Sequence, residues 1–220
     1  GVYAMKQSFS KENHVMLVDA GDHIQGTPVG LMTGGSAVID IMNVMGYDAV
    51  IPGNHEFDYT MPHFLKLIEK AEFPYICCNL TKDGKQIFPS YLIKEVDGVK
   101  IAFVGISTPT SLTTTDPKNL CDENGDLVYD FCQDQSGDRL YAAVQKAVDE
   151  AKQEGADYVI ALSHLGLLAA SIPWTFADVV ANTTGIDVII DGHSHDTEII
   201  TMKNKDGKDV IRTSTGTKLA

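Results

Sequence analysis

Side chains that can bind metal ions follow four apolar segments of the sequence. The four clusters are Asp19 and Asp22 after residues 15–18, Asn54, His55 and Asp58 after residues 49–51, His164 after residues 158–162, and Asp191, His193 and His195 after residues 187–190. Together they offer carboxylate, amide and imidazole groups, a ligand set that suits Zn, Mn, Fe or similar ions. If the clusters meet in the folded chain, they form a metal site.

A metal site of this composition can hydrolyse phosphoesters. Such ligands can hold two divalent ions about 3.5–4 Å apart, which lower the pKa of a bridging water and clamp a phosphoryl group for in-line attack. The leaving oxygen then needs a proton or a positive charge, and an imidazole held by a carboxylate can supply either. His55 and Asp58 stand three residues apart, close enough for Asp58 to orient His55.

The periodicity of the sequence predicts alternating strands and helices. Apolar runs predict strands within residues 14–22, 47–54, 75–80, 91–107, 157–164 and 186–195, the fourth being a hairpin that turns at Asp97–Gly98. Helical spacing predicts helices over residues 36–46, 61–71 and 138–155. This alternation favours an α/β layered architecture, in which ligands bind beyond the carboxyl ends of the strands. We therefore expect the four clusters to converge on one site.

Other features favour purely structural interpretations. A single His at a strand end is more often packed or solvated than a ligand, and it is the coincidence of four clusters that favours a metal site. His14, His23 and His63 lack supporting neighbours in the sequence, so we expect them to be packed or solvated. Residues 109–137 are rich in Thr, Asp and Asn and are predicted to form a long surface loop or insertion.

The four cysteines do not have the spacing of a zinc or redox site, because no pair shows the C-x-x-C pattern. We expect Cys77 and Cys78 to be packed free thiols in an apolar strand. Cys121 and Cys132 bracket a polar stretch and could form a disulfide, but we favour free thiols there too. The cysteines therefore do not indicate whether the protein lies in a reducing or an oxidising compartment.

Composition and charge narrow the class of function. The chain has 220 residues, of which 44% are hydrophobic, enough for a sizeable core in one large domain or a piece of a bigger protein. Its formal net charge of −13 argues against nucleic-acid binding by a basic surface. The same charge repels an anionic substrate unless bound cations change the local field. No apolar run could span a bilayer, and no signal peptide is present, although a mature or trimmed chain would have lost one.

Four segments, taken in order, resemble a known family. "VDAGDHIQG", "GYDAVIPGNHEFDY", "LSHLG" and "DGHSH" are similar to successive blocks of the calcineurin-like metallophosphoesterases. The best fit is to the 5′-nucleotidases, with the related UDP-sugar hydrolases and 2′,3′-cyclic phosphodiesterases. The resemblance implies a four-layer α/β/β/α sandwich and metal-dependent hydrolysis of phosphomonoesters, with 5′-nucleotides favoured as substrates. It also implies a secreted enzyme of nucleotide catabolism, extracellular, at the cell surface or periplasmic.

The resemblance further implies a role for each candidate site residue. The metal ligands that it implies are Asp22 as the bridge between two divalent ions, Asn54, His164 and His193 on the second ion, and His195 on the first. It favours Asp22 over Asp19 as the bridging ligand, and the ions would be Zn, Mn, Fe or Co. His55 would be the catalytic histidine, paired with Asp58.

Two departures from the family pattern concern the ends of the chain. The family opens with a strand whose Asp-x-His binds the first ion, but no Asp-x-His precedes Asp22, and "GVYAMKQSF" resembles the helix just after that strand. The family's nucleotidases also continue into a C-terminal domain that stacks the base, whereas this sequence stops at "TSTGTKLA". We therefore expect residues 1–220 to be a catalytic domain trimmed at both ends, weakly active alone and with little nucleoside preference.

Two alternative functions stay open. One is a 2′,3′-cyclic-nucleotide phosphodiesterase or UDP-sugar hydrolase that uses the same site. The other is a non-catalytic binding module that retains the fold, which the absence of Asp-x-His favours for residues 1–220 alone. The expected partners are a small phosphoester or nucleotide and the C-terminal nucleotide-binding domain of the same protein.

Overall fold

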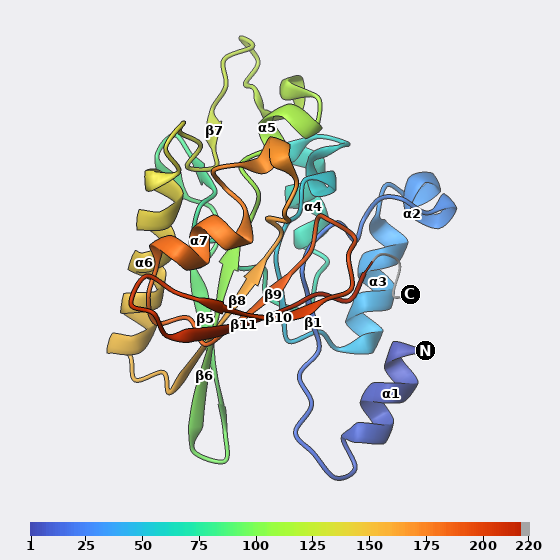
Figure 1. Ribbon diagram of the computed structural model, residues 1–220. Coiled ribbons are helices and arrows are strands. Elements are labelled where there is room, and N and C mark those ends of the chain that lie inside the picture. Colours follow the sequence, from blue (N-terminus) through green and yellow to red (C-terminus); the bar gives the residue numbers. More distant parts are fainter. Residues whose placement is uncertain (217–220) are drawn as a thin grey trace.

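A six-stranded mixed sheet forms the centre of the computed structural model, which describes residues 1–216 (Figure 1). Its strands lie in the order β10 (Ile199–Lys203), β11 (Asp209–Thr213), β9 (Val188–Asp191), β8 (Tyr158–Ser163), β6 (Val99–Ile106) and β5 (Tyr91–Val96). The four inner strands are parallel, and the two edge strands run antiparallel to their neighbours. The carboxyl ends of β8 and β9, which precede two of the candidate clusters, therefore lie at the same edge of the sheet.

A second, smaller sheet packs against the first. It consists of the parallel strands β1 (Val18–Asp19) and β2 (Ala49–Val50). Buried side chains of the two sheets and of the segment after β2 meet between them, namely Ala49, Ile51, Ile76, Phe103 and Leu162. This apolar layer fixes the position of β1 and β2 relative to β8.

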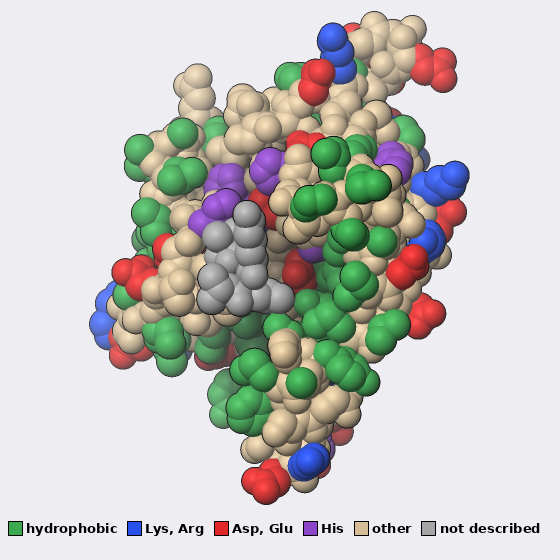
Figure 2. All heavy atoms as spheres, turned by 90° about the vertical axis from the view of Figure 1, so that its right-hand side faces the viewer, with side chains coloured by type: hydrophobic (Ala, Val, Ile, Leu, Met, Phe, Trp, Pro, Cys, Tyr) green, Lys and Arg blue, Asp and Glu red, His purple; other side chains and the backbone are tan. Residues whose placement is uncertain are grey.

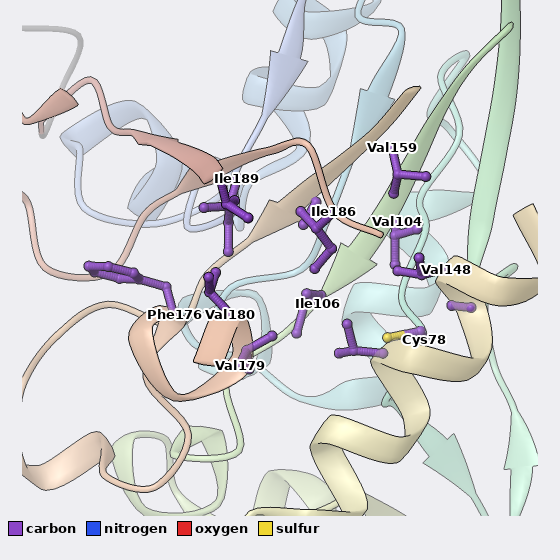
Figure 3. Close-up of a cluster of buried hydrophobic side chains, with 14 of the residues drawn as sticks. Cys78, Val104, Ile106, Val148, Val159, Phe176, Val179, Val180, Ile186 and Ile189 are labelled. Carbon is purple, nitrogen blue, oxygen red and sulfur yellow. The ribbon is translucent and has the colours of Figure 1, made fainter. Parts of the chain in front are cut away.

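Helices cover the outer faces of both sheets (Figure 1). α6 (Asp138–Gln153) and α7 (Phe176–Asn182) pack on the large sheet, and α3 (Ser36–Met45) and α4 (Met61–Ile68) pack on the small one. Figure 3 shows part of the core under the large sheet, where Val179 and Val180 of α7 and Val148 of α6 face side chains of the strands, Ile189 and Val104 among them. The order helix, sheet, sheet, helix confirms the predicted four-layer α/β/β/α sandwich.

Short elements complete the described part of the chain. They are α1 (Val2–Phe9), α2 (Pro28–Thr33), α5 (Ser111–Thr114), a small sheet of β4 (Lys85–Gln86), β3 (Thr81–Lys82) and β7 (Tyr129–Asp130), and 3₁₀ turns at His55–Phe57, Pro117–Leu120 and Ala169–Ser171. Among residues 1–216, no helix has the length and apolar character that crossing a membrane requires.

The predicted hairpin is confirmed in detail. Strands β5 and β6 pair antiparallel with Val96 opposite Val99. The two turn residues, Asp97 and Gly98, have φ angles of 51° and 81°. Positive φ at both central residues matches the right-handed twist of the strands, which is why Asp-Gly is a strong hairpin signal.

The strand predicted within residues 75–80 is wrong. The segment forms one isolated parallel bridge, between Tyr75 and Val50, and then leaves the small sheet. The Cys78 amide donates instead to the carbonyl of Gly105 in β6. The segment crosses from one sheet to the other, so no strand pairs with its full length, although its apolar residues are buried as expected.

The surface loop predicted for residues 109–137 is also wrong in part. Leu120, Tyr129 and Phe131 from this segment are buried in the core beside α4, where Phe131 packs edge-on against Phe57 with ring centroids 5.3 Å apart. Three apolar anchors are enough to fix a segment whose composition is otherwise polar.

All four cysteines are free, as favoured from the sequence. Cys77 and Cys78 are buried, which confirms that they are packed thiols. Cys121 and Cys132 do not form a disulfide.

Candidate metal centre

Three of the candidate ligands meet where the two sheets abut. Asp22 follows β1, His164 follows β8 and His193 follows β9, and one ligand atom from each lies within 4.8 Å of the others. His164 Nε2 is 2.9 Å from Asp22 Oδ2, and the His164 and His193 rings are 5.0 Å apart between centroids. The fold therefore gathers a carboxylate and two imidazoles from three separate strand ends.

Two buried atoms at this place lack the partners that buried polar groups normally have. Within the described residues, Asn54 Oδ1 and His164 Nε2 make no hydrogen bond, since the 2.9 Å contact of Nε2 with Asp22 lacks hydrogen-bond geometry. Asn54 is 4% exposed, and the amide of the next residue, His55, donates to Asp22 Oδ1 at 2.8 Å. A cation would satisfy an amide oxygen that receives no hydrogen bond. Together with a carboxylate and two imidazoles, this oxygen makes a ligand set that fits a divalent ion.

Glycines let the loops approach closely enough to build the site. A β-carbon on Gly53 would overlap the carboxylate of Asp22. A β-carbon on Gly21 would meet the backbone of Gly53 and lie 3.0 Å from His164 Nδ1, and Gly21 also has a φ of 93°. The sequence signals Pro52–Gly53 and Gly21 thus serve close packing of the Asp22 and His164 loops as well as turn formation.

The ring of His164 is fixed in orientation. Nδ1 donates to the carbonyl of Ala20 at 2.6 Å, which directs Nε2 toward Asp22. Burial disfavours the charged ring, but the neighbouring Asp22 carboxylate outweighs it and raises the pKa of His164 to about 9. Burial likewise opposes ionisation of Asp22, yet the charge of His164 holds the pKa of that carboxyl well below its usual range. The imidazole must lose its proton to act as a ligand.

His193 has the opposite electrostatic environment. Burial and the positive charge of His164 lower the pKa of His193 to about 4. Its ring is therefore neutral at pH 7 and keeps a lone pair for a metal ion. Its φ of 72° is unusual for a residue with a side chain, so the surrounding loop has to hold it in this conformation.

His55 lies at the rim of the site, next to the three ligands. Its Nδ1 is 2.6 Å from Asp58 Oδ2, and 42% of its side chain is exposed. Burial opposes protonation, but the hydrogen bond to Asp58 and the charge of Asp22 raise the pKa of His55 above its usual value. The ring is thus oriented by a carboxylate, open to solvent and adjacent to Asp22.

The remaining strand-end residues have other positions. Figure 2 shows a face of the molecule on which histidine side chains gather at the surface. His195 is exposed and is not a member of the three-residue group. Asp19 accepts from the amide of Gly21 and from His23 Nδ1, each at 2.9 Å, and so stabilises the loop before Asp22. Asp191 is buried and accepts from groups that flank His164.

The three histidines expected to be structural each have a partner. His14 pairs with Asp97 on the surface, and His63 hydrogen-bonds to the carbonyl of Gly34. His23 is packed, as predicted, but the fold gives it polar neighbours that are distant in sequence. Its Nε2 lies 2.7 Å from the Tyr75 hydroxyl, and burial is outweighed by Glu56 and Asp19, which raise the pKa of His23 to about 9.

Glu56 supports the loop of Asp22, a structural role that the sequence does not indicate. It is fully buried, and its Oε2 accepts from the amides of Gly53 (2.6 Å) and Asp22 (2.8 Å). Its Oε1 accepts from the amides of His23 (2.8 Å) and Ile24 (3.2 Å). One carboxylate thus joins the loops after β1 and β2 and holds Asp22 at a φ of 66°. The only signal in the sequence was an acidic residue beside Asn54 and His55, and nothing there indicates that it faces amides 32 to 34 residues away.

Comparison with known proteins decides the family. The family model described as calcineurin-like phosphoesterase matches residues 2–197. The chain belongs to this family. The resemblance first noted in four sequence blocks is thereby confirmed, and it extends over most of the chain.

Several of the curated relatives are named as nucleotide phosphoesterases or nucleotidases. The chain is 32% identical over 208 residues to the trifunctional nucleotide phosphoesterase protein YfkN of Bacillus subtilis, covering 83% of this chain and 13% of that protein. It is 32% identical over 217 residues to a 2′,3′-cyclic-nucleotide 2′-phosphodiesterase/3′-nucleotidase of Haemophilus influenzae, covering 87% of this chain and 31% of that protein. It is 32% identical over 188 residues to human 5′-nucleotidase, covering 84% and 30%. The chain therefore spans less than a third of the length of each of these relatives.

Solved structures agree with this placement. The NAD nucleotidase of Haemophilus influenzae superposes with a TM-score of 0.79 at 25% identity, covering 98% of this chain and 38% of that one. The 5′-nucleotidase precursor of Thermus thermophilus superposes with a TM-score of 0.78 at 25% identity, covering 97% of this chain and 42% of that one. The chain is thus related to the 5′-nucleotidase family, which is metal-dependent, and Asp22, His164 and His193 form a group able to hold an ion.

Glu56→Gln is expected to weaken Mn²⁺ binding by the chain about 10- to 100-fold, the usual effect of removing a group that orients a ligand. The backbone N–H groups that now donate to the Glu56 carboxylate would face the side-chain NH₂ group of glutamine, which is itself a donor. The loss of these hydrogen bonds would shift the Asp22 loop. Calorimetric titration with Mn²⁺ measures the change, and Glu95→Gln, at an exposed carboxylate of β5, is the matched control. Equal affinity in both variants would show that Glu56 does not position Asp22.

Proposed function

We propose that this domain hydrolyses phosphomonoesters in a metal-dependent reaction, with 5′-nucleotides as the favoured substrates. The observation that carries the proposal is the convergence of Asp22, His164 and His193, close to the chain at Asn54, whose buried amide oxygen has no hydrogen-bond partner among the described residues. These four residues would hold one ion, and His195 would contribute to a second. Divalent ions bound there supply an activated water and neutralise phosphate charge. They would also offset the net charge of −13, which otherwise repels an anionic substrate.

The protein's own catalytic group in this proposal is His55. Its ring is accessible at the rim, and Asp58 holds Nδ1, so Nε2 is the atom that faces an incoming substrate. From there it can donate a proton or place a positive charge next to the leaving oxygen. Asp58 orients the ring and favours its charged form, as the direction of the pKa shift indicates.

The nature of the substrate depends on more than this site. The names of the relatives include both 5′-nucleotidases and 2′,3′-cyclic-nucleotide phosphodiesterases, and all of them are longer than this chain. We propose that residues 1–220 are the catalytic domain of a longer protein that acts outside the cytoplasm, and that another domain of that protein selects the nucleoside. A UDP-sugar hydrolase with the same site is the third candidate.

Hydrolysis assays of the 220-residue chain test the core of the proposal. In excess Mn²⁺ we expect slow release of phosphate from AMP and from a small aryl phosphate at similar rates, and complete loss on chelation. The longer protein, supplied with AMP, 2′,3′-cyclic AMP and UDP-glucose in turn, would identify the substrate class. Metal binding without any hydrolysis would favour a binding module, and rapid, AMP-selective, chelator-resistant hydrolysis by the 220-residue chain would contradict the proposal.

A further inference from the structure

Arg212 is a buried arginine next to the loop that carries His193. It lies on β11, and its side chain is fully buried. Its guanidinium makes a two-pronged contact with Asp196: Nη2 donates to Oδ1 at 2.9 Å, and Nη1 donates to Oδ2. The group also stacks on the ring of Phe176, 4.4 Å from the centroid. A fixed arginine fork of this kind holds a carboxylate in both position and orientation.

The segment between Asp191 and Asp196 has a strained backbone. His193 and His195 have φ angles of 72° and 56°, in the left-handed region that residues with a side chain seldom adopt. Such conformations persist when surrounding contacts fix them. Asp196 ends this segment and Asp191 begins it, and Asp191 Oδ2 lies 3.5 Å from Arg212 Nη2. One guanidinium therefore holds both ends of the strained loop.

The same network reaches the loop of His164. Asp191 Oδ1 accepts from the Ser163 hydroxyl at 2.6 Å and from the Leu165 amide at 2.9 Å. These two residues flank His164 directly. Contacts that start at Arg212 thus set the backbone on either side of both histidines that approach Asp22.

We infer that Arg212, acting through Asp196 and Asp191, is a positioning residue that holds His193 and His164 in their ligand geometry. The inference rests on the proposed role of these histidines as metal ligands. The side chains of Arg212 and Asp191 are fully buried and that of Asp196 is 26% exposed, so the guanidinium supplies the positive charge that the carboxylates at the two ends of the loop need. The loop keeps its conformation because the fork constrains it, so a lysine at position 212 would supply charge without the constraint.

Asp196→Asn is the sharpest test, since it keeps the size of the side chain and removes its charge. Glu198→Gln is the matched control, because Glu198 also pairs with Arg212, at 3.5 Å, but is 49% exposed and lies outside the loop. Hydrogen exchange of the Gly192 and Ser194 amides, which donate within the network to Ser163 and Gly192 carbonyls, reports on the loop without any metal. Titration with Mn²⁺ reports on the ligand geometry.

In Asp196→Asn we expect exchange of these two amides to be about 10- to 100-fold faster, the equivalent of losing a charged hydrogen bond, and Mn²⁺ affinity to fall in parallel. Arg212→Lys should behave like Asp196→Asn if it folds, and Glu198→Gln should match the unaltered chain. Unchanged exchange and affinity in Asp196→Asn would overturn the inference. If the unaltered chain bound no Mn²⁺ while Asp196→Asn still exchanged faster, the proposed function would be overturned. The link from Arg212 to metal binding would be overturned with it.

Discussion

Asp22→Asn is expected to lower Mn²⁺ affinity by about 100-fold or more, beyond the effect of removing an orienting group. Hydrolysis should fall by about 10³-fold or more, because bound metal stabilises the transition state by several kcal/mol and each 1.36 kcal/mol is a factor of ten. Asp22 contacts His164 Nε2 and the His55 amide, so it is the carboxylate at the centre of the site. Asparagine keeps the acceptor for the His55 amide and removes the charge that a cation needs.

The control for this prediction is Asp19→Asn, the same change three residues earlier. Asp19 hydrogen-bonds to Gly21 and His23 and belongs to the supporting loop, so a much smaller loss is expected. Calorimetric titration with Mn²⁺ and hydrolysis of an aryl phosphate measure both effects. If Asp19→Asn proved the more damaging change, the central ligand would have to be reassigned.

His55→Ala is expected to reduce turnover by roughly 10²–10⁴-fold, the usual contribution of a general acid or base. Metal content should stay nearly unchanged, because the side chain of His55 pairs with Asp58 while only its backbone amide contacts Asp22. Turnover at saturating substrate and metal analysis of the purified variant are the two measurements. Their combination separates a proton donor from a ligand.

Two further variants calibrate the His55 result. Asp58→Asn should cause a smaller loss, since the ring stays present but is less firmly oriented. His63→Ala removes an imidazole that hydrogen-bonds to the Gly34 carbonyl, away from the three candidate ligands, and should leave turnover unchanged. Loss of metal from His55→Ala would make His55 a ligand and exclude the proposed role.

The sequence was sufficient for those features that depend on neighbouring residues. The Asp97–Gly98 turn has a local steric cause, and the helices follow from the spacing of apolar side chains, as in α6, where Leu140, Val144 and Ala151 are buried. Polar residues after parallel strands imply a site at the carboxyl ends of the strands, and Asp22, His164 and His193 do meet, although β1 belongs to a different sheet from β8 and β9. The order of the four motif blocks pointed to the family that the comparison establishes.

Contacts between distant segments determined the rest. Residues 109–137 are polar overall, yet Leu120 and Phe131 are held in a core whose other side chains come from elsewhere in the chain.

The groups that support the site depended most on tertiary structure. Glu56 accepts from amides more than 30 residues away, and Arg212 pairs with a carboxylate 16 residues away on a loop between two other strands. The folded backbone decides whether a charged side chain lies in solvent or supports a loop that carries metal ligands. Burying a charge is favourable only where partners surround it. The sequence by itself therefore determined which residue types could form the metal centre, and the tertiary structure alone decided which buried charges hold it in shape.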